Sequence, residues 1–585
     1  MATLTYLPET AAAPLSISRP DRRLRLAFWI FALLAAAVGA WVMRNTTSND
    51  GISYLDMAAA VAQGDWSAAI NGYWSPLYPL LLAAGLWIVK PAPMHEFALV
   101  HATNWLIFVG AFAGFDFFLR RIASSWVTRI AGYSVAIWAL LELVTTAGVS
   151  PDMLVAAFVF WAMGLVAGIA TGRARARSFV WLGVVLGLGY YAKAPLFPLA
   201  FVFLLLTLLA PGSWRQKLSG TLLAGFVFAL VAAPLIALLS WQKQRLTFGD
   251  SGKLNYAWYV DGATYRHWQG EPLGGPAEVA PHWRKGPVST GVPVHATRLI
   301  LTAPRVFEFA ASVRGTYPVW ADPSYWNEGL RAPFDFTQQI RKILVNLKFA
   351  YSLLLNVHVV QLFHNGQWYR VFSPVLLATW LALAWKLRPD RRGLSRAHAA
   401  LLLFAAAAFG MYLLVYCEPR HLAAFVAVLY TGLFAVLERD WIRQPLLARG
   451  AAAVLLASLL LTTGTSTLRL ALAPPDRFEA WQVASDLARM GVHEGARVAS
   501  LDYSNHRNAK WARLARARIV AELYEDAYAP LGAYWKLDEA AQARVLAAFR
   551  RAGATIVVDS SLPPQAQPPA GWERIGNTRY FLYRL

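Results

Sequence analysis

The chain has 585 residues, of which 57% are hydrophobic, 14% are aromatic and only 15% are charged, and its mean hydropathy is +0.40. This composition excludes an ordinary soluble protein and predicts a membrane protein that crosses the bilayer several times. The formal net charge of +21 is typical of Lys and Arg gathered in cytoplasmic loops, so it does not predict nucleic-acid binding. The single cysteine, Cys417, excludes an intrachain disulfide and a cysteine-based metal cluster.

The N-terminal part predicts a membrane anchor followed by a loop outside the membrane. Residues 1–25 end in the basic run RPDRRLR and are the expected cytoplasmic tail, and an apolar run follows at 26–43. No small-residue cleavage motif follows this run, which favours an uncleaved signal anchor over a signal peptide. Within the loop 44–96, the apolar run at 77–90 is too short to span a bilayer, so we expect a helix lying along the outer surface.

About eleven apolar segments approach the roughly 20 residues that a helix needs to cross a bilayer. Basic clusters fall on alternate connections between these segments, as the positive-inside rule requires of cytoplasmic loops. This register puts the N-terminus inside and three regions outside: 44–96, 241–368 and everything after 467. The expected spans are 26–43, 97–119, 130–148, 153–171, 178–192, 196–210, 219–240, 369–387, 398–416, 421–437 and 446–466.

The two later outer regions differ in character. Residues 241–368 are rich in Trp, Tyr, Pro and Gly, and their last third, 338–363, predicts another helix on the membrane surface. Residues 467–585 alternate strand-like runs with the helix-like run 538–553, which predicts a small α/β domain. No glycine-rich phosphate loop opens a helix there, so a nucleotide site is not supported. The strand-like runs are 497–502, 518–523, 555–559 and 580–585.

The expected organisation therefore combines two groups of membrane helices with two outer regions. It comprises a tail (1–25), an N-terminal transmembrane module (26–240), an outer loop (241–368), C-terminal transmembrane helices (369–466) and an extracytoplasmic α/β domain (467–585).

Asp50 is the first candidate for chemistry, because it lies just after the first predicted span in the run SNDGISYLD. A carboxylate is costly near hydrocarbon, so an acid at this place is a functional-site hypothesis. Gly51 allows a close backbone approach, and Asp50 on the outer face could accept a proton from a hydroxyl. An N-cap for the helix ISYLDMAAAVAQ is the structural alternative, and the two roles are compatible.

Two further charged residues are expected at the outer end of the helices. Asp152, in SPDM, begins the fourth span, and taken alone it is better explained as a helix start. If Asp152 converges with Asp50, one of the two acids would position an acceptor or a divalent cation. Lys193 lies in the Pro-broken run LGYYAKAPLFPL, where it would either bind a phosphate or reach the lipid headgroups by snorkelling.

The run YCEPRHL places Glu418, Arg420 and His421 between two predicted spans. An arginine here offers a planar, permanently charged fork that can bind two phosphate oxygens, whereas a local Glu418–Arg420 ion pair is the structural alternative. The aromatic residues Tyr73, Trp74, Tyr78 and Trp87 fit a membrane-interface belt, with stacking on a sugar ring as a second interpretation. His358 and His364 lack a third ligand at metal-binding spacing, so no metal is assigned to them.

These motifs resemble the GT-C superfamily of integral-membrane glycosyltransferases, which includes protein O-mannosyltransferases and the aminoarabinose transferases of lipid A. The chain differs from related members at Arg420-His421, where they often have Arg-Tyr, and at 192–195, where they have Thr-Lys-Gly-Pro. The sequence therefore does not identify which sugar is transferred. The matching features are Asn49-Asp50-Gly51, the loop GYWSPLYPLLLA (72–83), the SPDM turn (150–153), the Lys-Ala-Pro break (193–195), EPRHL (418–422) and a C-terminal outer domain.

The compact loops and the composition rich in Ala, Leu and Arg favour the bacterial inner membrane, and the resemblance implies a glycosyltransferase built on the roughly eleven predicted spans. It would transfer a sugar, with inversion, from a polyprenyl-phosphate donor to a hydroxyl of a glycan, lipid or protein acceptor on the outer side. Asp50 would be the general base, and Lys193 and Arg420 would stabilise the departing phosphate. The other residues expected at the substrate are Asn49, Tyr54, Trp74, Tyr78, Asp152 and His421.

A lipid or sugar transporter is the main alternative function. A structural or assembly factor whose C-terminal domain binds a cell-wall partner ranks last, because it leaves Asp50, Lys193 and Arg420 unexplained. Transporters usually show two halves with matching hydropathy and binding-site breaks near mid-bilayer. Here the outer mass is uneven and the candidate charges cluster at one face, which favours an enzyme.

Overall fold

The computed structural model describes most of the chain. The described residues are 19–145, 148–173, 175–263, 267–270, 291–355, 372–387, 395–438, 444–472, 478–501, 508–524, 532–563 and 566–585. His358, His364 and the end of the predicted surface helix 338–363 lie outside these ranges.

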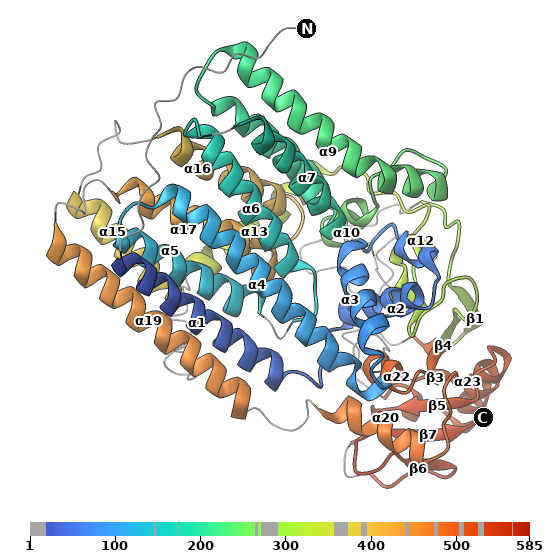
Figure 1. Cartoon of the computed structure of the whole chain (residues 1–585). Coiled ribbons are helices and arrows are strands. Elements are labelled where there is room, and N and C mark those ends of the chain that lie inside the picture. Colours follow the sequence, from blue (N-terminus) through green and yellow to red (C-terminus); the bar gives the residue numbers. More distant parts are fainter. Residues whose placement is uncertain are drawn as a thin grey trace.

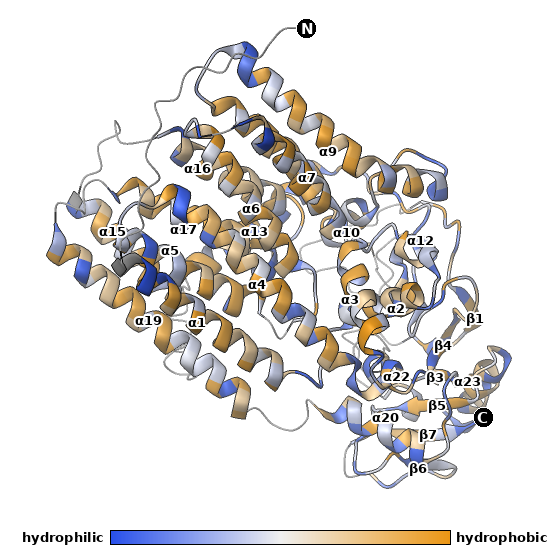
Figure 2. Cartoon of the chain, viewed as in Figure 1, coloured by the Kyte–Doolittle hydropathy of each residue, from blue (hydrophilic) through white to orange (hydrophobic). Residues whose placement is uncertain are grey.

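A bundle of membrane-type helices forms the larger part of the molecule (Figure 1), and its helices are hydrophobic along most of their length (Figure 2). Among the described residues, eight segments are long and apolar enough to cross a membrane. Their helices are α1 (Arg19–Val42), α4 (Glu96–Ile122), α5 (Trp126–Trp138) with the π-helical η3 (Ala139–Val144), α6 (Asp152–Ala170), α9 (Trp214–Lys243), α16 (Arg396–Leu413), α17 (Pro419–Val436) and α19 (Pro445–Leu472).

Three of the eleven predicted spans correspond to shorter apolar helices. They are α7 (Ala176–Ala192), α8 (Leu196–Leu206), which the short η4 (Thr207–Leu209) extends, and α15 (Phe372–Leu387). The predicted polytopic helical fold is confirmed, while the number of eleven spans stays a prediction.

Small residues allow the bundle helices to pack closely, as is common in membrane proteins. On α7, a Cβ atom at Gly183 would come within 2.5 Å of the Ala224 carbonyl oxygen on α9. One turn further along, a Cβ atom at Gly187 would come within 2.5 Å of the Val231 side chain. The two helices can therefore touch backbone to backbone only because glycine occupies both positions.

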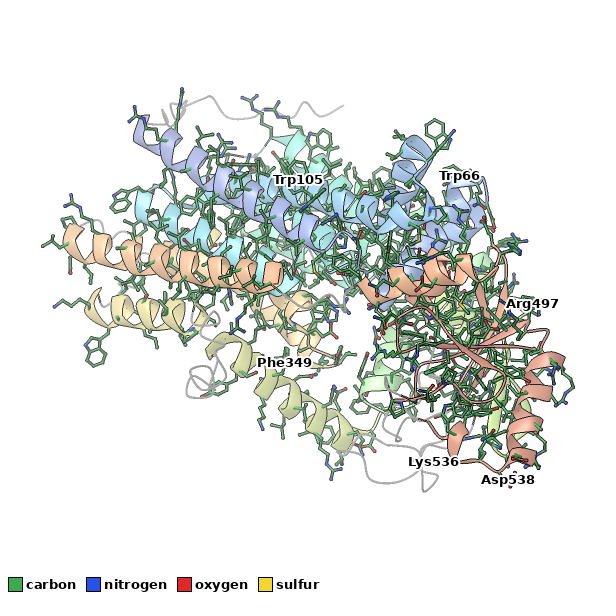
Figure 3. The ribbon with its side chains drawn as sticks, turned by 90° about the horizontal axis from the view of Figure 1, so that it is seen from below. Trp66, Trp105, Phe349, Arg497, Lys536 and Asp538 are labelled. Carbon is green, nitrogen blue, oxygen red and sulfur yellow. The ribbon has the colours of Figure 1, made fainter. Side chains whose placement is uncertain are left out.

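Short helices cover the end of the bundle that faces the C-terminal domain (Figure 1). The predicted surface helix at 77–90 is α3 (Leu77–Val89), and α13 (Phe336–Leu355) covers the described part of 338–363. In Figure 3, α13 lies at an outer edge of the molecule, where Phe349 is labelled. The remaining short helices at this end are α2 (Asn49–Ala62), η1 (Trp66–Ala69), η2 (Pro93–His95), α10 (Ser251–Tyr259), α11 (Pro318–Ala321) and α12 (Pro323–Trp326).

The predicted C-terminal α/β domain is confirmed. Its central strands β4 (Arg518–Leu523), β3 (Arg497–Ser500) and β5 (Ile556–Asp559) are parallel. At one edge, β7 (Phe581–Arg584) and β6 (Trp572–Arg574) continue the sheet in antiparallel fashion. The helices of this domain are α20 (Glu479–Arg489), α22 (Ala509–Leu514), η8 (Tyr534–Lys536) and α23 (Glu539–Arg551).

The sheet also includes two strands from the outer loop 241–368. Strand β2 (Arg305–Glu308) pairs with β4, and β1 (Arg298–Thr302) pairs with β2, both antiparallel. The described order is β1-β2-β4-β3-β5-β7-β6. Residues 298–308 and the C-terminal domain are therefore joined by a continuous hydrogen-bonded sheet.

A buried ionic cluster attaches this domain to α2. Arg513 on α22 contacts Asp56 Oδ1 on α2 at 3.1 Å and Glu96 Oε2 on α4 at 2.8 Å. The backbone N–H and the hydroxyl of Thr316 each donate to Asp56 at 2.8 Å. The helix that begins at Asn49 is thus held by residues of both 241–368 and 467–585.

Candidate active site

A cavity of about 260 Å³ opens at the end of the bundle that carries the short helices. It combines charged residues from the ends of α2, α6, α7 and α17 with aromatic residues from the short helices and the loops beside them. The lining residues include Asn49, Asp50, Tyr54, Tyr73, Trp74, Ser150, Asp152, Lys193, Asn255, Tyr259, Trp320, Tyr416, Glu418, Arg420 and His421. Every predicted site residue except Tyr78 lines this cavity.

Asp50 lies in the first turn of α2, where the helix dipole favours a negative charge. The prediction that Asp50 caps the helix is wrong, because Ser48 is the N-cap and its hydroxyl accepts from the Gly51 N–H at 3.1 Å. Both terminal nitrogens of Arg420 donate to Asp50 Oδ2 at 3.3 Å. The Trp320 indole N–H donates to the other oxygen, Oδ1, at 3.2 Å. Asp50 is therefore directed into the cavity with a fixed partner on each oxygen.

Gly51 allows the close approach that the sequence suggested. A Cβ atom at this position would lie 2.3 Å from Thr47 Oγ1 and 2.7 Å from Val149 Cγ1. Such distances are far below van der Waals contact, so a larger residue would push the start of α2 away from the loop before α6. The glycine thus brings the backbone of Asp50 close to the segment that ends at Asp152.

Asp152 and Lys193 form a direct ion pair in the cavity. Lys193 Nζ donates to Asp152 Oδ1 at 2.5 Å, and only 2% of the Asp152 side chain is exposed. The alternative in which Lys193 snorkels to the headgroups is wrong, because its amine pairs with the buried acid. Asp152 is the first residue of α6, so the prediction that it begins a helix is confirmed. Its side chain does not cap that helix and instead pairs with Lys193.

Glu418 and Arg420 do form the local ion pair that was the alternative interpretation, with Arg420 Nε 2.6 Å from Glu418 Oε2. The same guanidinium nevertheless also reaches Asp50, and its Nε lies 3.7 Å from Asp152 Oδ2. The Arg420 guanidinium therefore contacts three carboxylates, which come from α2, from α6 and from the residue before α17.

Glu418 is a site residue to which the sequence assigned only the local pair. Tyr416 donates its hydroxyl to Glu418 Oε1 at 2.8 Å. Burial raises the pKa of Glu418, but the charges of Arg420 and His421 outweigh that effect and hold the pKa below its usual value. His421 completes the group, with Nε2 4.0 Å from Glu418 Oε2 and its ring stacked near Tyr412.

Aromatic rings form the opposite wall of the cavity. The prediction of a membrane-interface belt is wrong for Trp74 and Tyr78, whose exposed fractions are 6% and 0%, whereas Trp87 is 66% exposed and fits it. Trp74 packs edge-on against Tyr54, with ring centroids 5.0 Å apart. Tyr78 packs behind Tyr54 and donates its hydroxyl to Asn104, so it supports the wall from outside the cavity.

Trp320 and the Tyr259–Tyr416 pair are members of this wall that the sequence did not single out. The rings of Tyr259 and Tyr416 are stacked, with centroids 3.9 Å apart and planes 5° apart. The only sequence signal for Trp320 was the abundance of Trp and Tyr in 241–368, which gives no position. Burial raises the pKa of Tyr73 well above its usual value, so its hydroxyl stays protonated beside the carboxylates.

A second, more apolar cavity of about 220 Å³ adjoins the first. Both cavities are lined by Lys193, Ala194, Pro195, Ser251, Asn255, Tyr416 and His421. Its apolar lining comes from the break between α7 and α8, from the loop before α10 and from the end of α16. These residues are Pro195, Pro198, Phe248, Met411, Tyr412 and Val415.

The donor set of the cavity does not suit a bound divalent cation. Asp50, Asp152 and Glu418 already face Lys193 and Arg420, which supply positive charge at these oxygens. Within the described ranges, no group of three or more His, Cys, Asp or Glu is arranged to hold a metal ion.

Comparisons with protein-family models and with curated protein sequences find no significant match. Solved structures do match along almost the whole chain. The crystal structure of ArnT from Cupriavidus metallidurans bound to undecaprenyl phosphate has a TM-score of 0.51 at 12% identity and covers 95% of this chain and 97% of ArnT.

The Archaeoglobus fulgidus oligosaccharyltransferase in complex with Zn and sulfate has a TM-score of 0.50 at 12% identity, over 91% of this chain and 67% of the other. Both neighbours are GT-C glycosyltransferases. The chain therefore has the GT-C fold, as the motifs around Asp50, Lys193 and Arg420 predicted.

Proposed function

We propose that the protein is a membrane glycosyltransferase of GT-C type that transfers a sugar from a polyprenyl-phosphate donor to an acceptor hydroxyl, with inversion. The observation that carries this proposal is the convergence of Asp50, Lys193 and Arg420 in a cavity that continues into an apolar one. An enzyme that uses a lipid-phosphate sugar donor needs a base for the acceptor hydroxyl, cations for the phosphate and an apolar slot for the lipid tail.

The donor would lie across both cavities. Its isoprenoid tail would occupy the apolar cavity around Phe248, Met411 and Val415, and its phosphate would lie at the shared boundary beside Lys193. Arg420 would bind a second phosphate oxygen through its planar fork. The presence of undecaprenyl phosphate in the ArnT crystal structure, which shares this fold, supports this class of donor.

Asp50 would act as the general base. It takes the proton of the acceptor hydroxyl while the hydroxyl oxygen bonds to the anomeric carbon, and the bond from that carbon to the phosphate oxygen breaks. Attack from the face opposite the phosphate inverts the configuration, and polyprenyl phosphate leaves with the electron pair. A positioned base contributes about 10²–10⁴-fold in rate.

Lys193 and Arg420 would stabilise the negative charge that grows on the departing phosphate. Both cations are already held by carboxylates, Lys193 by Asp152 and Arg420 by Glu418, so little reorganisation is needed during the reaction. By analogy with a lost oxyanion-hole donor, each cation is worth about 3–4 kcal/mol.

The orientation of the bundle supports catalysis on the outer face of the bacterial inner membrane. Helix α1 has 24 residues and is therefore roughly 36 Å long. Arg25 lies near its start, where it pairs with Asp116, and Asp50 follows its end. If the basic end faces the cytoplasm, as the positive-inside rule predicts, the cavity opens on the opposite side.

The test is Asp50→Asn, which preserves shape and removes the basic carboxylate. We expect kcat of the purified enzyme to fall by about 10²–10⁴-fold with a labelled polyprenyl-phosphate sugar, while donor binding is retained. Asp65→Asn is the matched control, because Asp65 lies in the same outer loop but does not line the cavity. A fully active Asp50→Asn enzyme would overturn the proposal.

The same assay separates the enzyme from the alternative transporter. Detergent-solubilised protein has no compartments, so transport cannot change the chemistry of the labelled donor. Transfer or hydrolysis of the sugar under these conditions excludes a pure transporter.

A further inference from the structure

Trp320 makes a contact that no sequence motif suggested. Its indole N–H donates to Asp50 Oδ1 at 3.2 Å across 270 positions of the chain, while Arg420 holds Oδ2 at 3.3 Å. A single partner lets a carboxylate rotate about its Cβ–Cγ bond. Two partners on different oxygens fix the plane of the group.

The contacts of Arg420 and Trp320 differ in kind. Arg420 carries a charge that pairs with Asp50, Asp152 and Glu418 together. Trp320 is a neutral donor with one N–H, so it can orient the carboxylate without cancelling its charge. A base that must accept a proton is better oriented by a neutral group than by a second cation, because a cation disfavours the protonated product.

Trp320 is itself held rigidly against the helix that carries Asp50. Its carbonyl oxygen accepts from the Ser53 hydroxyl on α2 at 2.9 Å and from the Trp74 indole at 3.0 Å. The next residue, Ala321, accepts from the Asn71 amide at 2.9 Å. These bonds tie the backbone of α11 to α2 at one point and to the loop between α2 and α3 at two, so the backbone that carries the indole is fixed relative to the helix that carries Asp50.

We propose that Trp320 is a positioning residue that sets the orientation of the Asp50 carboxylate for proton transfer. This inference rests on the proposed function, since it assigns Trp320 a role in the same reaction. A hydrogen bond to a charged group contributes enough that its loss should lower kcat by about 10–100-fold. The KM for the donor should change little, because replacing Trp320 by Phe keeps an aromatic ring in the cavity wall and leaves Lys193, Arg420 and the apolar cavity unchanged.

The primary variant is Trp320→Phe, which retains an aromatic ring and removes the N–H. Trp326→Phe is the matched control: Trp326 is buried in the adjoining α12 and donates its indole N–H to the Pro318 carbonyl at 2.7 Å, outside the cavity. We expect Trp320→Phe to lose kcat at constant donor KM. Trp326→Phe should keep kcat within about threefold of wild type at a similar loss of thermal stability.

A double-mutant cycle separates positioning from a purely structural role. If Trp320 acts through Asp50, Trp320→Phe should cause no further loss of residual rate in the Asp50→Asn enzyme. An equal loss in both backgrounds, or a wild-type kcat for Trp320→Phe, overturns the inference. An active Asp50→Asn enzyme refutes the proposed function itself, so the two failures are distinguishable.

A second variant covers the case in which Trp320→Phe does not fold. Ser53→Ala leaves the indole in place and removes one of the bonds that hold its carbonyl oxygen. We expect it to lower kcat by about 3–10-fold, in line with the loss of one neutral hydrogen bond, with unchanged donor KM. An unchanged kcat for Ser53→Ala would count against the inference.

Discussion

Replacing Arg420 by Lys tests whether the site depends on the shape of the guanidinium or only on its charge. Arg420 lies 2.6 Å from Glu418, 3.3 Å from Asp50 and 3.7 Å from Asp152, so one planar group serves three carboxylates. A lysine ammonium keeps the charge but is a point donor on a flexible stem, and it cannot span these positions together.

The magnitude follows from the contacts that would be lost. Lysine could keep the short contact to Glu418, but it would release Asp50 and lose the second donor to a phosphate. The loss of one preorganised donor at developing charge lowers kcat by about 10²–10³-fold. Because the Arg420 side chain is 29% exposed, water can replace part of the lost bonding in the resting enzyme, so stability should fall far less than the rate.

The assay compares kcat, donor KM and thermal unfolding of the purified enzymes in detergent. Arg298→Lys is the control, because Arg298 makes a surface ion pair with Glu308 in the sheet and its side chain is 74% exposed. We expect no measurable change in rate for this control. A kcat for Arg420→Lys within about threefold of wild type would refute the argument that a planar fork is needed.

Three further predictions concern the supports of the site. Lys193→Met leaves Asp152 buried without its closest cation, so we expect both a loss of transfer and a destabilisation of about 3–5 kcal/mol, measured by chemical unfolding. Arg513→Ala leaves Asp56 and Glu96 unpaired between the C-terminal domain and α2, with a similar cost and an increase in proteolysis at the domain junction. Glu418→Gln should destabilise the protein at pH 7, since the lowered pKa of Glu418 stabilises the fold above the unfolded value of about 4.3. This difference from wild type should shrink as the pH falls through the folded-state pKa, which unfolding curves at several pH values would detect.

The sequence was most informative where a charge interrupts an apolar run. Asp50, Lys193 and Arg420 stand out because burying an ion near hydrocarbon is costly and needs a reason. Glycine gave the second reliable signal, because Gly51 is required by a contact that any Cβ atom would block. Four strands of the C-terminal domain were also predictable, because each is a short apolar run that can be read locally, whereas the three-residue β6 was not predicted.

Other features depend on contacts that no local pattern encodes. Lys193 has no acid near it along the chain, yet the fold brings Asp152 to 2.5 Å from its amine. The sequence around Trp74 is the same whether its ring faces lipid or the protein interior. The sequence alone therefore could not distinguish a membrane-interface residue from the buried wall residue that Trp74 is. Strand β2 joins the sheet through β4, more than two hundred positions later, and nothing within 241–368 indicates this pairing.

The distribution of the site along the chain has a consequence for biosynthesis. Ribosomes make the Asp152–Lys193 pair first, long before Trp320 and Arg420, which supply both partners of Asp50. A half-made chain therefore carries Asp152 and Lys193 but lacks both side chains that hold Asp50. On the proposed function, transfer would begin only after α17 has been made, so a nascent chain would not consume donor lipid before the protein is almost complete.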